Sequence, residues 1–295
     1  MLSNLIRALR LPFITASALP FIFGSLIVRK NFNLWGFFYG LIAVIATHLS
    51  ANLINDYADS KSRADEQDKK YYAFFGGSKL IQEGVYSAKF YLRLAVFFGL
   101  LSFLSVLLLA LNLQDPSVIV FYFVIIISSW LYSHKPLQFS YHRVGEFFIF
   151  LLFGPSLVMG GYFIQTKIFP SLNSFLLSLP FGLLTTAILF ANEVPDSIED
   201  NKAGKFTWVS ICGRERAYLV YFSLVCLALL CVIINAVMGY LKPLSLFSLI
   251  LILPAIRATI VLKQYYTDKI RLVESSRLTI AMQALASLIL IAGVF

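Results

Sequence analysis

Nine long apolar runs constrain the fold of this chain more than any other feature. Each run is about 20 residues long, the length that an α-helix needs to cross the hydrocarbon core of a bilayer. The runs are continuous rather than alternating, so they predict membrane-spanning helices and disfavour an outer-membrane β-barrel. Only 13% of the residues are charged, against about 25% in a soluble domain. The predicted spans are residues 11–28, 35–54, 91–111, 117–133, 145–164, 174–191, 218–238, 244–262 and 278–294.

These runs take up nearly all of the 295 residues. No separate soluble domain fits between them, so residues 1–295 are predicted to form a single all-α domain with about nine transmembrane helices. The first run is followed by many others and has no small-residue cleavage site. We therefore expect a retained span rather than a signal peptide.

Lysine and arginine residues fall mainly on one side of the predicted bundle. The N-terminus and the loops after the second, fourth, sixth and eighth runs hold 20 of the 24, and the other side holds Arg29, Lys30, Lys167 and Lys242. The positive-inside rule then predicts a multi-pass protein of the cytoplasmic (inner) membrane, with its N-terminus inside and its C-terminus outside. This bias accounts for most of the net charge of +9. The expected partner is the lipid bilayer and not nucleic acid, for which the loops carry no motif.

Two acidic segments end the second and sixth apolar runs, both on the predicted cytoplasmic side. Spacings of three and four residues put their polar side chains on one helical face. Acidic groups at membrane depth are costly and usually functional, and hard oxygen ligands suit Mg²⁺ bound together with phosphate oxygens. The four aspartates are therefore predicted to bind metal and to be catalytic, and the two asparagines to bind substrate. These residues are Asn52, Asp56 and Asp59 in the first segment and Asn192, Asp196 and Asp200 in the second.

Other polar residues nearby are left out of this predicted site. Glu193 and Glu199 are expected to point away from the face that carries the aspartates. His48 lies one turn before Asn52 and shares its face, but a lone histidine is more often a packing residue. Asp65 follows in the loop, and no role is predicted for it.

Basic residues follow the acidic segments on the same side. Lys79 and Lys205 both lie near glycines, in Gly76-Gly77-Ser78-Lys79 and in Gly204-Lys205, and glycine lets a backbone approach an anion. A diphosphate leaving group gains charge as its C–O bond breaks, and a nearby lysine stabilises that charge. Lys79 and Lys205 are thus the preferred diphosphate-binding residues, although positive-inside bias alone explains most lysines here.

The loop after the fourth run is polar, aromatic and basic. Lys135 or Arg143 could close over the phosphates from this loop, and an ordinary turn explains the same residues equally well. Gly154-Pro155 follows inside the fifth run and predicts a kink in that span.

Together these features resemble the UbiA superfamily of intramembrane aromatic prenyltransferases. The resemblance covers nearly the whole chain and is strongest to the 1,4-dihydroxy-2-naphthoate polyprenyltransferase branch. The family motif falls on the asparagine and aspartate residues of the two acidic segments. Further matching residues are Gly76-Gly77-Ser78 with Gly84, Gly145-Glu146 with Gly154-Pro155, and Gly204-Lys205 with Thr207.

The resemblance implies a fold, a reaction and a pair of substrates. The expected fold places the helices around a central cavity. The expected reaction is Mg²⁺-assisted ionisation of a polyprenyl diphosphate, attack by an electron-rich aromatic ring on the allylic cation, and loss of a ring proton. In the naphthoate branch decarboxylation accompanies the attack, so 1,4-dihydroxy-2-naphthoate, a precursor in menaquinone biosynthesis, is the expected acceptor.

Two departures from the family pattern bear on the acceptor. Arg63 stands where the 4-hydroxybenzoate branch usually has an aspartate, which favours the naphthoate-like branch. Glu193-Val194-Pro195 stands where the naphthoate branch more often has a second asparagine and an arginine before the aspartate. Another acceptor on the same fold, such as 4-hydroxybenzoate, homogentisate or a lipid precursor, therefore stays open.

The sequence disfavours three functions outside this reaction. A CDP-alcohol phosphotransferase would need an Asp-Gly-x-x-Ala-Arg run, and the sequence has none. A transporter with a carboxylate ion site would carry its charges near the middle of the bilayer, whereas these lie at the ends of spans. An inactive scaffold is the least favoured function, because both acidic segments are intact.

Overall fold

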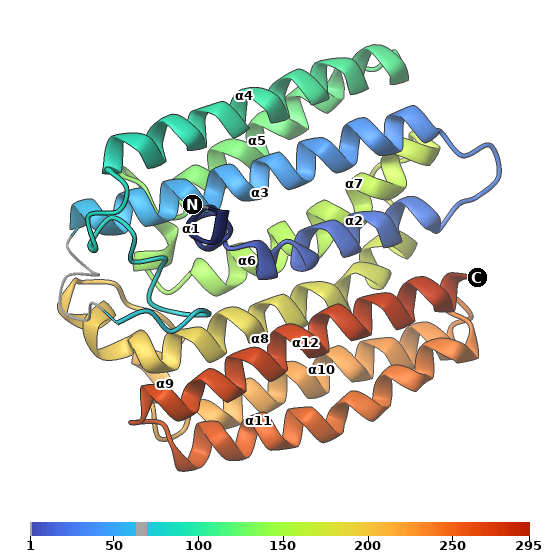
Figure 1. Ribbon diagram of the computed structural model, residues 1–295. Coiled ribbons are helices and arrows are strands. Elements are labelled where there is room, and N and C mark those ends of the chain that lie inside the picture. The colour runs from blue at the N-terminus through green and yellow to red at the C-terminus, as the bar shows by residue number, and fades with distance from the viewer. Residues whose placement is uncertain (1, 63–69) are drawn as a thin grey trace.

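A computed structural model describes residues 2–62 and 70–295 as a bundle of helices that run roughly parallel to one another (Figure 1). In this part of the chain, seven helical segments are long and apolar enough to cross a membrane, and two apolar segments are shorter. The predicted all-α fold is confirmed, since the nine segments coincide with the nine predicted spans. The long segments are Leu34–Lys61, Ala88–Leu113, Gly145–Thr166, Leu172–Lys202, Ala217–Val237, Pro243–Gln264 and Lys269–Val294, and the shorter are Leu11–Leu26 and Ser117–Leu131.

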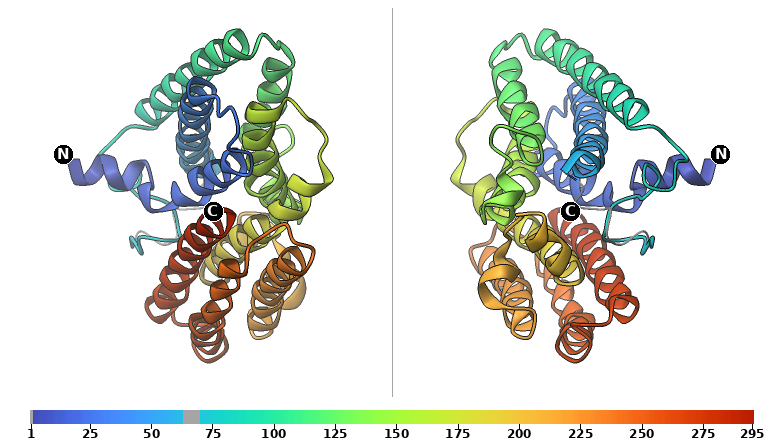
Figure 2. Two further views of the ribbon diagram at one scale, coloured as in Figure 1. Left: turned by 90° about the vertical axis from the view of Figure 1, so that its right-hand side faces the viewer. Right: turned by 90° about the vertical axis from the view of Figure 1, so that its left-hand side faces the viewer.

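The helices form two groups, seen end-on in Figure 2. The C-terminal group packs beneath the N-terminal group through α8 and α12. The first group consists of α1 (Leu2–Ala8), η1 (Leu11–Phe13), α2 (Thr15–Leu26), α3 (Leu34–Ser62), α4 (Ala88–Leu113), α5 (Ser117–Leu131), η2 (Phe139–Tyr141), α6 (Gly145–Phe153) and α7 (Pro155–Thr166). The second consists of α8 (Leu172–Lys202), α9 (Trp208–Cys212), α10 (Ala217–Val237), η3 (Pro243–Leu251), α11 (Ile252–Gln264) and α12 (Lys269–Val294).

Local sequence explains where several helices begin. Ser87 caps α4 by accepting a hydrogen bond from the Phe90 amide, and Asp268 caps α12 by accepting from the amides of Ile270 and Arg271. Side-chain oxygens at these positions satisfy amides that have no partner inside the helix.

Close packing of α2 against α7 depends on two glycines. A Cβ added at Gly24 would lie 2.1 Å from the Val158 carbonyl oxygen, and one at Gly161 would lie 2.5 Å from the Phe21 carbonyl oxygen. Both obstacles are backbone atoms, so neither position has room for a larger residue. Small residues let membrane helices approach closely in this way.

The kink predicted in the fifth span is confirmed. The span divides into α6 and α7, with Gly154 between them and Pro155 as the first residue of α7. A Cβ at Gly154 would lie 2.8 Å from the Gly182 Cα, so the kinked backbone lies directly against α8.

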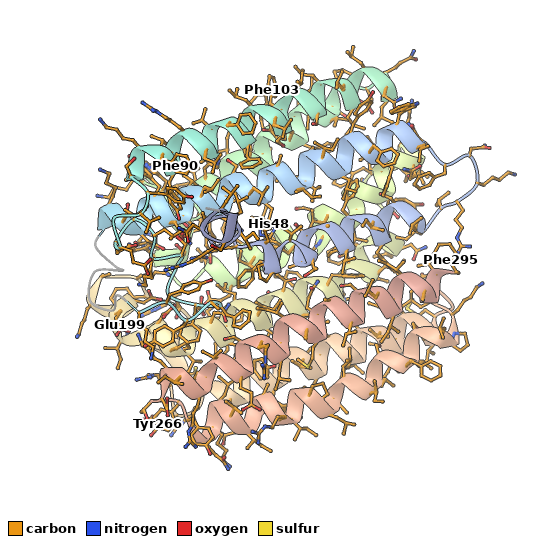
Figure 3. The ribbon with its side chains drawn as sticks, in the orientation of Figure 1. His48, Phe90, Phe103, Glu199, Tyr266 and Phe295 are labelled. Carbon is orange, nitrogen blue, oxygen red and sulfur yellow. The ribbon has the colours of Figure 1, made fainter. Side chains whose placement is uncertain are left out.

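Both acidic segments lie at one end of the bundle. Helices α3 and α8 continue past the predicted ends of their spans, so each segment forms the last turns of a long helix. The loop of residues 70–87 runs across this end, at the left of Figure 1, whereas α12 ends at the right. Figure 3 shows Glu199 at the first end, Phe295 at the opposite end and His48 between them. Arg63 and Asp65 lie outside the described residues.

Candidate active site

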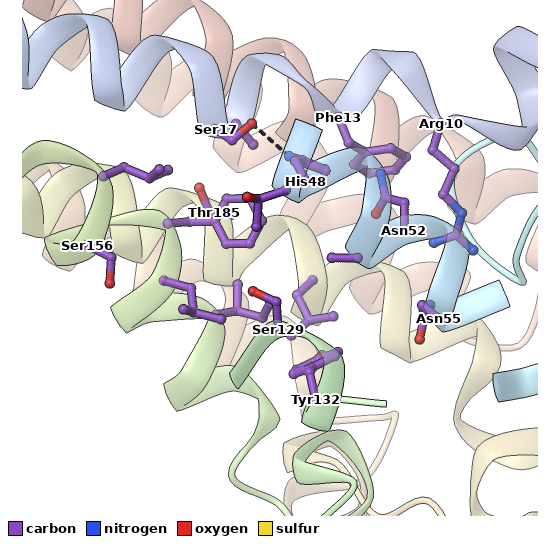
Figure 4. Close-up of a pocket in the computed structure, with 18 of the residues that line it drawn as sticks. Arg10, Phe13, Ser17, His48, Asn52, Asn55, Ser129, Tyr132, Ser156 and Thr185 are labelled. Atoms are coloured by element: carbon purple, nitrogen blue, oxygen red, sulfur yellow. Dashed lines mark hydrogen bonds between the residues drawn. The ribbon is translucent and has the colours of Figure 1, made fainter. Parts of the chain in front are cut away.

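A cavity of about 550 Å³ opens between the two acidic helices. Its walls include Asp59 from α3, and Asp196 and Asp200 from α8. Deeper inside, the walls become apolar and reach residues such as Val118 and Ile164, near the opposite end of the bundle. Figure 4 shows part of the polar wall, with Arg10, Asn52 and Asn55 near its mouth and Ser17, His48 and Thr185 further in. The cavity thus has a charged mouth and a long apolar interior.

The first acidic segment is held by two donors. Arg10 Nη2 donates to Asp56 Oδ1 at 2.8 Å, and the Ser78 amide donates to Asp56 Oδ2 at 3.2 Å. Asp56 is only 3% exposed and Asp59 only 8%. Arg10 reaches Asp56 from a left-handed backbone conformation (φ 49°) just before η1. These two donors fix the orientation of the Asp56 carboxylate.

The second acidic segment is held in a similar way. The Gly76 amide donates to Asp196 Oδ2 at 2.8 Å, and Lys205 Nζ lies 3.4 Å from Asp200 Oδ1. Lys205 is positioned by its neighbour Phe206, whose backbone bonds to Tyr141 and Arg143 in the loop after α5. The end of α8 is therefore held by the loop of residues 70–87 and, through Lys205 and Phe206, by the loop after α5.

One turn joins the two acidic segments across the cavity mouth. The amides of Gly76 and Ser78, two residues apart, bond to Asp196 of α8 and to Asp56 of α3. This requires left-handed backbone conformations at Gly76 (φ 70°) and Gly77 (φ 73°), which glycine adopts at little cost. The Gly76-Gly77-Ser78 motif thus brings the two halves of the predicted site together.

Lys79 and Lys205 both line the cavity, and Lys79 is only 3% exposed. Burial alone would lower the pKa of Lys205, but Asp200 and Asp59 outweigh that effect and hold its pKa well above the usual value. Lys205 therefore stays cationic beside both acidic segments.

Lys135 and Arg143 are not brought to the cavity. Both side chains are exposed, and neither lines it. The Arg143 guanidinium instead lies 5.5 Å from the centre of the Phe206 ring, and its amide donates to the Phe206 carbonyl. The loop after α5 therefore supports Lys205 through the backbone and contributes neither of these two cations to the cavity.

The expectation that Glu193 and Glu199 point away from the aspartates is wrong, since both line the cavity. The reason is helical geometry: Glu193 and Glu199 lie three residues before and after Asp196, and a spacing of three shares a face as a spacing of four does.

Several cavity residues were missed or not singled out in the sequence. Arg10 is far from Asp56 in sequence, and its charge is explained just as well by the topology bias. Lys269, at the start of α12, lies 3.1 Å from Glu199 and 5.9 Å from the centre of the Tyr72 ring. Lys70 lies 5.4 Å from the same ring, so three basic residues join the predicted lysines around the mouth.

His48 is a packed residue that also lines the cavity. Its Nδ1 is 2.7 Å from Ser17 Oγ, and its ring meets Phe153 edge-on at 5.3 Å. These contacts explain its burial, as expected for a lone histidine.

The oxygen ligands around the mouth suit Mg²⁺ only if water and substrate phosphates complete its coordination. Among residues 2–62 and 70–295, no three His, Cys, Asp or Glu side chains converge closely enough to hold a metal by themselves. Mg²⁺ in proteins commonly uses one or two carboxylates together with waters and substrate phosphates. The carboxylates of Asp59, Asp196 and Asp200 line one cavity and supply the hard oxygens that such an arrangement needs.

The apolar part of the cavity reaches the outer surface along α5. Phe121 and Val124 line the cavity, yet their side chains are 39% and 60% exposed. The wall is therefore thin here, and an apolar ligand in the cavity would meet lipid at this point.

Comparison with known proteins agrees with this geometry. A model of the UbiA prenyltransferase family matches residues 17–280. The 1,4-dihydroxy-2-naphthoate octaprenyltransferase of Escherichia coli (strain K12) is 30% identical over 229 residues, 72% of this chain and 72% of that protein. The UbiA prenyltransferase domain-containing protein 1 of Dictyostelium discoideum is 28% identical over 186 residues, 62% of this chain, and the match spans 55% of its length.

A solved structure shows the same fold. A UbiA homolog from Archaeoglobus fulgidus bound to GPP and Mg²⁺ superposes with a TM-score of 0.68 at 16% identity, covering 98% of this chain and 99% of that one. At this identity the likeness concerns the fold alone. The family match, by contrast, extends over most of the sequence and includes both acidic segments, and on that ground the chain belongs to the UbiA prenyltransferase family.

Proposed function

We propose that this protein transfers a polyprenyl chain from a polyprenyl diphosphate to an aromatic acceptor at the cavity between α3 and α8. One observation carries the proposal. Acidic segments from two helices lie across from each other at a mouth lined with cations, and the same cavity continues into a long apolar interior. A charged mouth suits a diphosphate, and an apolar interior suits a hydrocarbon chain.

The residues at the mouth divide into two groups in this reaction. Asp59, Asp196 and Asp200, which line the cavity, and Asp56, which does not, would hold Mg²⁺. This ion, when bound, neutralises the diphosphate and helps the C–O bond to break. Lys79, Lys205 and Arg10 would meet the oxygens of the departing diphosphate, where charge grows in the transition state. Asn52 and Asn192 would orient the donor, since Asn52 Nδ2 and Asn192 Oδ1 are both buried without a hydrogen-bond partner.

The chain's own residues also protect the allylic cation. The apolar walls below the mouth exclude water, which would otherwise capture the cation before the aromatic ring attacks. The new carbon–carbon bond forms between the cation and the ring, and the diphosphate leaves with the electron pair of the broken C–O bond. The ring then restores its aromaticity by losing a proton or, where the attacked carbon bears a carboxylate, by breaking that C–C bond and releasing CO₂.

The acceptor we propose first is 1,4-dihydroxy-2-naphthoate, and the reaction would then be a step of menaquinone biosynthesis. The Escherichia coli relative bears the name of that activity, and the chain covers most of its length. We further propose that the protein lies in the cytoplasmic membrane with the cavity mouth and the N-terminus inside. The support is the 20-to-4 division of basic residues between the two ends.

The test is a transfer assay on the purified protein in lipid nanodiscs. A long polyprenyl diphosphate and Mg²⁺ are offered with 1,4-dihydroxy-2-naphthoate, 4-hydroxybenzoate or homogentisate in separate reactions. We expect a prenylated naphthol product with release of CO₂, no product after Mg²⁺ is chelated, and recovery when Mg²⁺ is restored. Product only with another acceptor would replace the proposed substrate. Failure with every acceptor, together with solute flux in sealed vesicles, would replace the enzyme by a transporter.

A further inference from the structure

Two buried glutamates form a unit beside the cavity that the proposed reaction does not use. Glu146, in the first turn of α6, is 1% exposed, and Glu193 of α8 is 5% exposed. The Trp208 amide donates to Glu146 Oε1, and Glu146 is near enough to Glu193 for the two carboxyl groups to interact. Glu193 thus lies beside the residue of α6 that the start of α9 holds.

Glu193 also has a buried oxygen without a partner. Glu193 lines the cavity, and its Oε2 is buried with no hydrogen-bond partner. Buried polar atoms are nearly always paired, and an unpaired one is costly. A donor that enters the cavity and reaches Glu193 would satisfy this oxygen.

The reactants of the proposed reaction differ in what they can offer this oxygen. The diphosphate is an anion with acceptor oxygens only, and a carboxyl group beside it gains nothing. The polyprenyl chain is a hydrocarbon with no polar hydrogen. The aromatic acceptor is the reactant that carries hydroxyl groups, which can donate.

We propose that Glu193 accepts a hydrogen bond from a hydroxyl of the aromatic acceptor and so fixes the ring against the allylic carbon. The inference rests on the proposed function and adds a specificity residue to it. Glu193 lies three residues before Asp196, so a ring bound here lies about one helical turn from the carboxylate that faces the diphosphate.

The first test separates acceptor binding from the rest of the reaction. Glu193→Leu should raise the KM for the acceptor by at least about tenfold, while the KM for the polyprenyl diphosphate and the Mg²⁺ concentration for half-maximal rate stay within about twofold. Glu193→Gln keeps a carbonyl oxygen and should restore most of the acceptor affinity. Gln283→Leu is the matched control: Gln283 also has a buried oxygen without a partner, but it lies on α12 and does not line the cavity.

The second test uses the acceptor and needs no variant. One acceptor hydroxyl is proposed to donate a hydrogen bond to Glu193, and its methylation should raise the KM of the wild-type protein for the acceptor. With that methyl ether, Glu193→Leu should have the same KM as the wild-type protein. Each hydroxyl is methylated in turn. If the wild-type protein uses every methyl ether as well as the parent compound, the proposal is overturned even if Glu193→Leu does not fold.

Two other results would also overturn it. An unchanged acceptor KM in folded Glu193→Leu would remove Glu193 from the acceptor site. A shift in Mg²⁺ dependence without a shift in acceptor KM would make Glu193 a metal ligand instead. Either result leaves wild-type prenyl transfer intact, whereas failure of the proposed function would appear as no transfer by the wild-type protein.

Discussion

Replacing Lys205 by alanine should slow prenyl transfer by about 30- to 1,000-fold without unfolding the protein. The Lys205 ammonium lies 3.4 Å from Asp200, and its side chain is only 21% exposed. Its pKa is held well above the usual value by Asp200 and Asp59 despite burial, so it is fully charged at neutral pH. A fixed cation in such a site can offset the charge that grows on the departing diphosphate.

The magnitude follows from the position of this lysine. One well-placed donor to a developing anion contributes about 2–4 kcal/mol to transition-state stabilisation. Lys205 belongs in that range rather than among surface charges, because little solvent reaches it to screen the interaction. Asp200, if it held Mg²⁺, would attract Lys205 less strongly, and the lysine would be free to turn to the diphosphate. The loss should therefore appear in the rate of transfer more than in binding of the donor.

The assay compares single-turnover rates of Lys205→Ala and Lys242→Ala in nanodiscs. Lys242 lies at the opposite end of the bundle, where its ammonium bonds to the Phe295 carbonyl oxygen. We expect Lys242→Ala to match the wild-type rate and Lys205→Arg to recover part of it. Inhibition by free diphosphate should weaken only in Lys205→Ala. If Lys205→Ala and Lys242→Ala lose the same small amount, Lys205 is only a charge that sets topology, and the argument from its position fails.

Three further predictions test the site, the packing and the topology. Asp196→Asn keeps an oxygen for the Gly76 amide but removes a charge. The rate of prenyl transfer should therefore fall at least about 100-fold at saturating Mg²⁺ while the protein stays folded. Near-normal turnover would exclude this carboxylate from the metal site. Gly161→Ala should lower the free energy of unfolding by about 1–3 kcal/mol, because the new Cβ meets the backbone of α2. Gly160 has open space around it, so Gly160→Ala should change the free energy of unfolding by less than about 0.5 kcal/mol. Equal melting temperatures of the two variants would contradict this packing. In a chain whose three native cysteines are replaced by serine, an impermeant thiol reagent outside intact cells should label Lys242→Cys and not Lys202→Cys, and the reverse pattern would invert the predicted topology.

Much of the bundle could be predicted from the sequence because the bilayer imposes a simple rule. A span needs a continuous apolar run, and each predicted run corresponds to a helical segment. The ends of α3 and α8 could not be found in this way. Both helices continue for about two turns or more beyond the apolar residues, because their polar ends pack against the loop of residues 70–87 rather than against lipid.

The candidate site was only partly visible in the sequence. The aspartates stood out because charge is rare near a span, and regular spacing placed them on a face. Arg10 did not, since its contact with Asp56 joins residues that are distant in the chain and passes through a single left-handed backbone position. Glu193 lies three residues before Asp196, a spacing that shares its helical face, so helix geometry alone places it beside the aspartates. Lys135 and Arg143 could not be placed from the sequence, because membership of a loop does not tell which way a side chain turns.

The thin wall along α5 has a consequence for how such a protein is supplied with its ligands. Phe121 and Val124 face both the cavity and the lipid, so a hydrophobic molecule can reach the interior by diffusing in the plane of the membrane. Its occupancy then depends on its mole fraction among the lipids and not on its concentration in the surrounding water. Diluting the bilayer with inert lipid should empty the cavity, whereas diluting the whole suspension with buffer should not.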